Sequence, residues 1–162
     1  MTHGLFEWVD VSVPDLEAGA RFYEAVFGWR AEPSRSADGS DTSYRMLRKD
    51  GRLAAGMVQT SAAQIPGSGM WNAYVTVDDA TVIATRAEGL GAQVVVPPMD
   101  IGAHGIMTYI RDPQGAYLGF WEPGTHRGAE AYNESGFLTW NGLATRDFAG
   151  SKAFYSELMP EW

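Results

Sequence analysis

The sequence predicts an α+β fold built from βαβββ modules, and three observations predict it. Residues 9–15 resemble residues 73–79 at an offset of 64, and each segment is an alternating apolar run that leads into an aspartate. Such a run is typical of a strand, and the aspartate is suited to begin a helix. Residues 4–30 also lie over residues 136–162 at an offset of 132, with matches that include a paired Phe-Tyr. The chain is therefore expected to hold two full modules and the opening of a third.

The elements of the first module follow from hydrophobic periodicity. Residues 8–13 alternate as in a strand with two unlike faces. Asp15 is the expected N-cap of a helix whose apolar residues recur at helical spacing until Gly28 ends it. Three extended runs follow, and a turn at residues 49–51 joins the last two. These runs are residues 30–32, 43–48 and 53–59.

The second module repeats this order. A strand at 72–77 precedes a helix that begins at Asp79 and ends near Gly89. Residues 112–115, Asp-Pro-Gln-Gly, form the expected turn between the last two strands. The three strands after the helix are expected at residues 93–96, 104–110 and 117–121.

The repeats also define the expected domains. A complete two-module domain covers residues 1–123, with modules at about 4–60 and 70–123, and residues 124–135 are expected to be a linker. Residues 136–162 are expected to form the first strand and helix of an incomplete second domain. A lone strand and helix cannot bury their apolar faces, so they must dock within the chain, stay mobile, or exchange with a second copy in a homodimer.

Composition excludes several classes of function. The formal net charge of −8 opposes binding to nucleic acid and to anionic membranes. No run approaches the roughly 20 apolar residues of a membrane span, and the N-terminus lacks a secretion signal, so a cytoplasmic location is expected. The absence of cysteine removes disulfides, thiolate catalysis and iron–sulfur clusters. Three histidines are few for transition-metal chemistry.

The order of these features resembles the vicinal oxygen chelate superfamily of glyoxalases, bleomycin-resistance proteins and extradiol dioxygenases. The resemblance rests on residues 13–16, on Phe22-Tyr23 leading to residues 27–29, on the turn at 112–115, and on the paired modules. It implies that the modules pair so that a mixed sheet curls around one cavity, with the helices outside. The third copy resembles the start of a second domain in tandem members, cut short here.

The resemblance also implies where a metal would be held. Enzymes of this superfamily bind a divalent ion through side chains on the first and last strands of each module. Those positions fall on Trp8, Gly56, Asn72 and Gly119. Trp and Gly offer no ligand atom, and one Asn carbonyl cannot hold a transition metal against water. We therefore expect neither a bound metal nor another cofactor.

Strand alternation predicts what lines the cavity instead. The aliphatic residues of each first strand should face the helices, which leaves aromatic and polar residues on the concave side. We expect the ligand-binding residues to be Trp8, Asp10, Asn72, Tyr74, Tyr117 and Trp121. Asp10 either contacts a ligand or is satisfied by Arg45, by Arg48 or by backbone groups.

Three functions remain open. The favoured one is a metal-free protein that binds an aromatic or cationic small molecule, such as a natural product, because aromatic rings stack and attract cations. The first alternative is a metal-independent lyase, isomerase or oxygenase-like enzyme acting on a small oxygenated metabolite, with Asp10 or His104 as candidate catalytic residues. The second alternative is a non-catalytic interaction scaffold.

Overall fold

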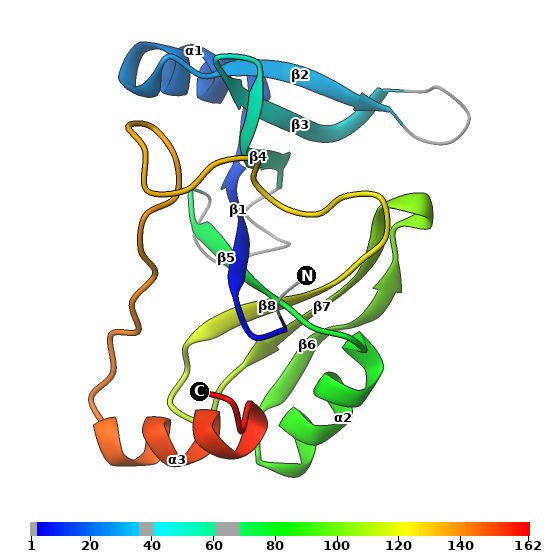
Figure 1. Cartoon of the computed structure of the whole chain (residues 1–162), viewed down its shortest axis with the longest axis vertical. Coiled ribbons are helices and arrows are strands. Elements are labelled where there is room, and N and C mark those ends of the chain that lie inside the picture. The colour runs from blue at the N-terminus through cyan, green and yellow to red at the C-terminus, as the bar shows by residue number, and fades with distance from the viewer. Residues whose placement is uncertain (1–2, 36–40, 61–68) are drawn as a thin grey trace. The chain divides into compact units, whose positions relative to one another are not determined.

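The computed structural model describes residues 3–35, 41–60 and 69–162 (Figure 1). Its helices and strands form the predicted α+β fold, and the chain divides into two compact units. The α1 unit comprises residues Trp8–Asn72 and Gly128–Trp140. The α2 unit comprises Met1–Glu7, Ala73–Arg127 and Asn141–Trp162. None of the helices in the described part of the chain has the length and apolar character needed to cross a bilayer.

The α1 unit contains the predicted first module. Its strands are ordered β2-β3-β4-β1, with β3 antiparallel to both β2 and β4, and β1 parallel to β4. The first two residues of β1 belong to the α2 unit. The elements are β1 (Phe6–Val13), α1 (Leu16–Phe27), β2 (Arg30–Arg35), β3 (Asp41–Lys49) and β4 (Arg52–Gln59).

The α2 unit contains the second module, with strands ordered β5-β8-β7-β6. Strand β6 runs four residues beyond the predicted end at Val96 and contains two prolines, which its place at the edge of this order tolerates because an edge strand need not donate every backbone hydrogen bond. The elements are β5 (Trp71–Thr76), α2 (Ala80–Gly89), β6 (Gln93–Asp100), the 3₁₀ helix η1 (Gly102–His104), β7 (Gly105–Arg111), β8 (Tyr117–Pro123) and α3 (Phe148–Leu158).

The predicted helix starts are confirmed. Asp15 Oδ1 accepts hydrogen bonds from two backbone N–H groups in the first turn of α1, and Asp79 Oδ1 does the same for α2. These bonds satisfy donors that a helix start otherwise leaves without partners. Gly28 ends α1 with φ of 70°, a left-handed conformation that glycine adopts without steric cost.

The strand faces follow the predicted alternation. Val13 and Met57 reach Gly19 of α1, so the aliphatic face of β1 and β4 covers that helix. In the α2 unit, Val75 and Phe120 belong to the same core cluster as Ile83 of α2. The remaining residues of β1, β5 and β8 therefore project from the face opposite the helix of their own unit, called the inner face below.

The third copy differs from the expectation. The helix forms as α3, with Asp147 accepting a hydrogen bond from Gly150 N, but the predicted strand before it is wrong. Residues 139–145 have no regular structure, and in the described segments the only pairing near them is the bridge between Tyr132 and Leu138. A strand is stable only beside a neighbouring strand. In the first copy β1 pairs with β4, whereas the equivalent segment of the third copy has no such neighbour among the described residues.

The residues expected to be a linker are also bonded into the fold. Glu130 accepts a hydrogen bond from Leu53 N at 2.6 Å, and Glu134 pairs with Arg52 at 2.7 Å. Trp29 Nε1 donates to Gly136 O at 2.8 Å. Residues 128–136 thus pack on the α1 unit.

Helix α3 docks within the chain. Phe154, Leu158 and Met159 are buried in the core of the α2 unit, together with residues of α2. The Tyr155 hydroxyl donates to Asp112 Oδ2 at 2.9 Å, which joins α3 to the turn between β7 and β8. The sequence leaves three outcomes open for this segment: docking within the chain, mobility, or exchange with a second copy. In the structure the helix docks on its own chain.

Replacing Leu158, which is fully buried, with Ala is expected to lower the free energy of unfolding by about 2–5 kcal/mol, because the change removes buried methyl groups and leaves a cavity. The control is Phe148→Ala on the same helix, where the side chain is 76% exposed and the expected change is within about 0.5 kcal/mol. Urea unfolding of both variants measures the difference. Equal, small effects would show that α3 is not part of the core.

Candidate functional site

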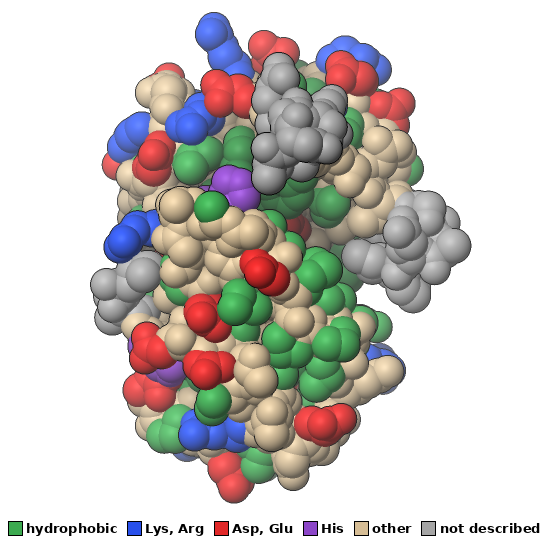
Figure 2. All heavy atoms as spheres, turned by 90° about the vertical axis from the view of Figure 1, so that its right-hand side faces the viewer, with side chains coloured by type: hydrophobic (Ala, Val, Ile, Leu, Met, Phe, Trp, Pro, Cys, Tyr) green, Lys and Arg blue, Asp and Glu red, His purple; other side chains and the backbone are tan. Residues whose placement is uncertain are grey.

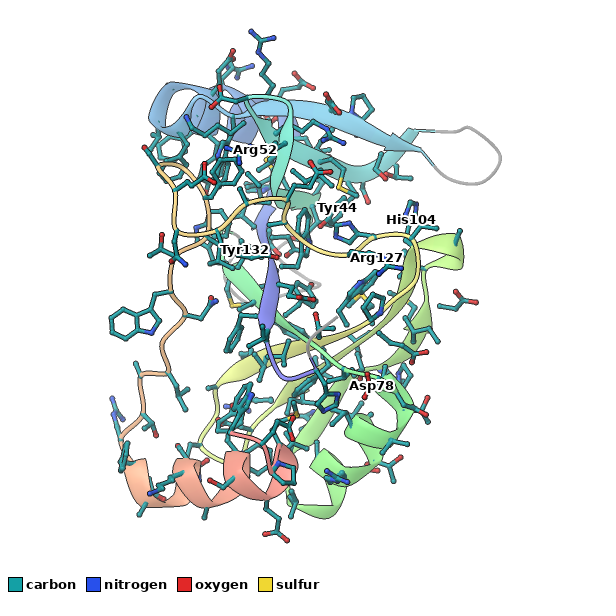
Figure 3. All side chains as sticks on the ribbon, in the orientation of Figure 1. Tyr44, Arg52, Asp78, His104, Arg127 and Tyr132 are labelled. Atoms are coloured by element: carbon teal, nitrogen blue, oxygen red, sulfur yellow. The ribbon has the colours of Figure 1, made fainter. Side chains whose placement is uncertain are left out.

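A buried polar cluster lies on the inner face of the α1 unit. Asp10 on β1 is only 4% exposed, and its Oδ1 accepts a hydrogen bond from Asn72 Nδ2 at 2.7 Å. Its Oδ2 accepts one from the Tyr44 hydroxyl at 3.3 Å, and Trp8 Nε1 donates to the same hydroxyl at 2.9 Å. Figure 3 shows Tyr44 among the side chains near β1. Four side chains from three strands are therefore connected in one hydrogen-bond network.

Tyr44 reaches this cluster because a glycine leaves room for its ring. In the strand register, Gly56 on β4 lies opposite Asp10 and diagonally beside Tyr44, which pairs with Val58. Diagonal neighbours on antiparallel strands are within reach of an aromatic side chain, and an aromatic ring commonly covers a strand glycine. A Cβ atom on Gly56 would overlap the Tyr44 hydroxyl. The space over Gly56 is filled by the tyrosine.

The electrostatics of the cluster keep Tyr44 protonated. Burial raises the pKa of Tyr44 well above its ordinary value of 10.0, and the nearby Asp10 carboxylate raises it further, while the hydrogen bond from Trp8 opposes the shift. The phenol is therefore a proton donor to Asp10 at neutral pH. The cluster offers a buried carboxyl group held by an amide and a phenol.

Two partners of Asp10, Asn72 and Tyr44, are not among the residues considered from sequence. Arg48 pairs with Glu32 at 2.8 Å and with Glu130 at 3.3 Å, so its proposed bond to Asp10 is wrong. Arg45 Nη1 donates to the backbone carbonyl of Thr42 at 2.8 Å. An amide and a phenol satisfy the carboxyl oxygens of Asp10.

The α2 unit repeats the pairing of tyrosine with glycine. Tyr74 on β5 and Tyr109 on β7 both lie opposite Gly119 of β8, and a Cβ atom there would overlap the Tyr74 ring. Tyr109 stacks with Tyr117 at a centroid distance of 6.0 Å and an interplanar angle of 18°. Tyr117 is 41% exposed and ends this row of rings.

Two further candidates lie in the α2 unit. Trp121 Nε1 donates to His126 O at 2.9 Å, which fixes the indole. His104 lies on η1 (Figure 3), where its side chain is partly exposed and its backbone carbonyl accepts hydrogen bonds from the N–H groups of Gly124 and His126. No contact of the His104 ring singles it out as a catalytic group.

The six residues expected to bind a ligand fall into two groups, one in each unit, and two tyrosines beside them were not expected. Trp8, Asp10 and Asn72 form one cluster, and the other three expected ligand-binding residues, Tyr74, Tyr117 and Trp121, lie in the α2 unit. Tyr44 and Tyr109 were missed. The available signal was a glycine inside each last strand, which marks a place where another group approaches closely. Their identity depends on the strand register, which periodicity does not determine.

The residues at the metal positions of the superfamily do not fit a metal ion. Trp8 carries no ligand atom, and the space beside Gly56 and Gly119 is taken by tyrosine rings. Among residues 3–35, 41–60 and 69–162, no group of three or more His, Cys, Asp or Glu side chains is placed to hold one. Asn72 already donates its amide to Asp10.

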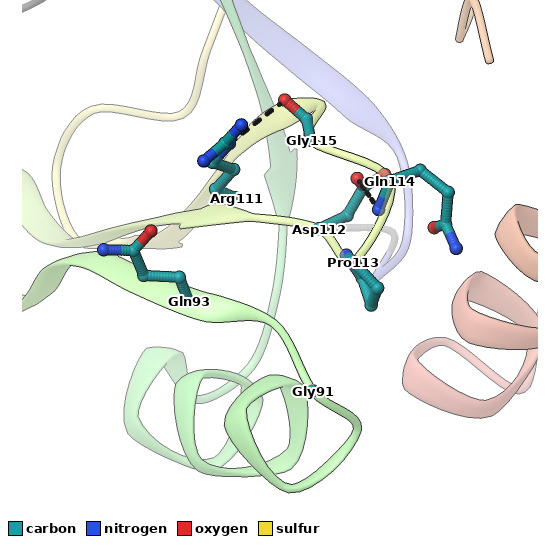
Figure 4. A pocket seen from close by; sticks show the side chains of 7 residues that line it. All are labelled: Gly91, Gln93, Arg111, Asp112, Pro113, Gln114 and Gly115. Carbon is teal, nitrogen blue, oxygen red and sulfur yellow. Dashed lines mark hydrogen bonds between the residues drawn. The ribbon is translucent and has the colours of Figure 1, made fainter. Parts of the chain in front are cut away.

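A separate pocket of about 260 Å³ lies beside the turn between β7 and β8 (Figure 4). Asp112 is its acidic residue, but Oδ1 accepts from Gln114 N and Ala116 N and Oδ2 accepts from Tyr155. This carboxylate therefore organises the turn and secures α3. The pocket is lined by Gly91, Gln93, Arg111, Asp112, Pro113, Gln114 and Gly115.

Removing the Tyr44 hydroxyl tests the cluster. Tyr44→Phe removes the hydroxyl that accepts from Trp8 Nε1 and donates to Asp10. The free energy of unfolding should therefore fall by about 1–3 kcal/mol at pH 7. Because folding raises the pKa of Tyr44, its contribution is complete below about pH 10 and is lost as the pH rises further. Chemical unfolding at pH 7 and above pH 10 checks both parts. If the difference in free energy of unfolding between wild type and Tyr44→Phe grew larger above pH 10, the raised pKa assigned to Tyr44 would be contradicted.

Adding one methyl group at Gly56 tests whether the tyrosine fills the space. Gly56→Ala should destabilise the protein by about 1–3 kcal/mol, because a buried ring must move. The matched control is Gly142→Ala, where an added Cβ meets nothing within 4 Å and should change stability little. Thermal unfolding compares the two. If Gly56→Ala were as well tolerated as the control, the region over Gly56 would be open.

Relatives share most of this chain. A Mycobacterium tuberculosis protein named as a candidate glyoxylase, CFP32, is 35% identical over 161 residues, covering 96% of this chain and 60% of that protein. The anthracycline biosynthesis protein DnrV of Streptomyces peucetius is 31% identical over 160 residues, covering 91% of this chain and 58% of that protein. The chain thus spans about three fifths of the length of the curated relatives it matches.

Solved structures support the fold. A methylmalonyl-CoA epimerase in complex with methylmalonyl-CoA superposes with a TM-score of 0.55 at 13% identity, covering 78% of this chain and 99% of the epimerase chain. The epimerase from Mycobacterium tuberculosis gives a TM-score of 0.51 at 17% identity, covering 76% of this chain and 93% of that chain. The model of the Glyoxalase/Bleomycin resistance protein/Dioxygenase superfamily matches residues 5–120. The chain belongs to this superfamily.

Proposed function

We propose that this protein binds a planar aromatic small molecule without a metal ion. The observation that carries the proposal is the replacement of the metal positions of the superfamily. Two of them are glycines covered by tyrosine rings, one in each unit. The other two are a tryptophan that donates to Tyr44 and an asparagine that donates to Asp10. Linings of this kind favour stacking and hydrogen bonding over Lewis-acid chemistry.

Aromatic side chains on the inner faces supply the stacking surfaces. Tyr117 is the most exposed ring of its row, with Tyr109 stacked on it and the Arg111 guanidinium 5.9 Å from its ring centre, so a flat ligand that stacks on Tyr117 must share the ring with Arg111 or displace it. Such a contact contributes about 0.5–1.5 kcal/mol beyond buried area. Trp121, in the same unit, extends the set of aromatic residues that we propose contact the ligand.

The net charge favours a cationic group on the ligand. Acidic side chains are spread over the face shown in Figure 2, in keeping with a formal net charge of −8. The resulting potential attracts cations. The relative named for anthracycline biosynthesis is consistent with this chemistry, since an anthracycline is a polycyclic aromatic compound.

A metal-independent enzyme is the second candidate, and one observation favours it. The Asp10 carboxyl and the Tyr44 phenol lie 3.3 Å apart, an arrangement in which one group could accept a proton and the other donate one. The relatives named as glyoxylases agree with an enzymatic role. Product formation separates this candidate from simple binding.

The test uses an anthracycline aglycone, which is planar and uncharged, and its amino-sugar glycoside, which is cationic. Both should quench tryptophan fluorescence saturably, the glycoside at lower concentration, and EDTA should leave the titrations unchanged. Tyr117→Ala should weaken binding about 3- to 10-fold, as expected for the loss of one stacked ring, while Phe148→Ala, which removes an exposed ring elsewhere, serves as the control.

Mass spectrometry of the recovered ligand completes the test. An unaltered ligand supports binding without chemistry, whereas a time-dependent product would favour the enzyme. Binding that EDTA abolishes and one equivalent of a divalent ion restores would overturn the metal-free proposal.

A further inference from the structure

Helices α1 and α3 are two copies of one sequence pattern. At the offset of 132 residues, Asp15 corresponds to Asp147, and both are N-caps. The Phe-Tyr pair at 22–23 corresponds to the pair at 154–155. Their surroundings can therefore be compared position by position.

One face of α3 is buried against the α2 unit. Ser151, Phe154 and Leu158 are 3%, 6% and 0% exposed, and their spacing places them on one side of the helix. Phe154 and Leu158 belong to the same core cluster as Ile83 of α2, and Arg86 Nη1 of α2 donates to Leu158 O at 3.2 Å. Figure 1 shows α2 and α3 as neighbouring helices. This side of α3 is called the docking face below.

On the equivalent face of α1 the two large apolar side chains are exposed, whereas Gly19, the counterpart of Ser151, lies against Val13 and Met57 of its own strands. Phe22 and Val26, the counterparts of Phe154 and Leu158, are 59% and 52% exposed. The side of α1 that carries Leu16 is covered, since Leu16 is 7% exposed. On α3 the relation is reversed, because Phe148, the counterpart of Leu16, is 76% exposed. Each helix thus has two apolar sides, of which α1 buries only the one toward its own strands and α3 only the docking face.

We propose that the docking face of α1 binds the α2-type helix of a further βαβββ module. When a two-fold axis relates the first pair of modules to a second pair, each contact between the two pairs occurs twice. The contact of the third module's helix with α2 is one of the pair, and its counterpart joins α1 to the corresponding helix of a fourth module. The curated relatives contain about two fifths of their length outside the match, which leaves room for such a module in proteins of this kind.

The contacts of α3 specify the chemistry of the partner. The helix of the partner module should carry small and branched apolar residues on one side, as α2 does with Ala80, Ile83, Ala84 and Ala87. A carboxylate in the turn between the last two strands of that module would accept a hydrogen bond from the Tyr23 hydroxyl, as Asp112 accepts one from Tyr155. Burial of Phe22 and Val26 supplies the hydrophobic stabilisation.

The first test transplants the docking face within the 162-residue chain. Because Phe154 and Tyr155 already match α1, Leu158→Val with Met159→Phe gives α3 the α1 residues at the two large apolar contacts that differ, and Ser151 is left unchanged. This pair should raise the unfolding equilibrium constant by no more than about 10-fold, whereas Leu158→Ser with Met159→Ser should raise it by about 1,000-fold. Hydrogen exchange of the α3 amides should stay slow in the first pair. If both pairs released α3 equally, the α1 face would not fit an α2-type helix.

The second test measures α1 directly. Because the protein has no cysteine, Val26→Cys introduces a single thiol for labelling. In a four-module chain made by continuing Trp162 with a second copy of residues 31–127, labelling at position 26 should slow at least about 10-fold relative to the 162-residue chain. Val82→Cys on α2, where Val82 is 51% exposed, should react equally in both. A folded four-module chain with a fully reactive thiol at position 26 would overturn the proposal, and if that chain does not fold, the transplant decides.

Analytical sedimentation tests whether a second copy of the chain, and not an α2-type helix, covers the docking face of α1. A dimer of the 162-residue chain that Val26→Asp dissociates, and that Val82→Asp does not, would place a second copy on α1 and overturn the assignment to an α2-type helix.

Discussion

The packing of tyrosine over glycine is the constraint on which both inner faces depend. Gly56 admits the Tyr44 ring, and the ring brings a phenol within reach of Asp10 and Trp8. Gly119 admits Tyr74 in the same way. A residue with a side chain at either glycine would displace a buried ring, so a metal ligand cannot be added there without rebuilding the face. The absence of ligand atoms and the presence of the rings are therefore one structural feature.

Buried polar groups make this arrangement sensitive to change. The Asp10 carboxyl is almost without solvent contact, and its oxygens accept hydrogen bonds from Asn72 and Tyr44. Leaving such a group without partners costs more free energy than the bonds themselves contribute. Within the α1 unit, the cluster joins β1 and β3 to Asn72 at the start of β5. Asp10 thereby has a structural role whether or not it also contacts a ligand.

Local patterns predicted the helices and the strand faces, because N-caps and alternation act over a few residues. Asp15 and Asp79 began their helices as expected, and the aliphatic sides of β1 and β5 faced them. The strand expected before α3 did not form, since a strand depends on neighbours that periodicity does not reveal. Tyr44 was missed for a related reason. Its contact with Asp10 joins positions 34 residues apart through the register of three strands.

We propose that the tyrosine rings over Gly56 and Gly119 take the place that a metal ion has in other members of this superfamily. Calorimetric titration of chelator-treated protein with Zn²⁺, Ni²⁺ and Mn²⁺ tests it most directly. The account predicts no saturable binding at one equivalent per chain for any of the three ions. Stoichiometric binding that Asn72→Ala abolishes would contradict it, because Asn72 is the one residue at those positions with a side-chain donor atom suited to an ion.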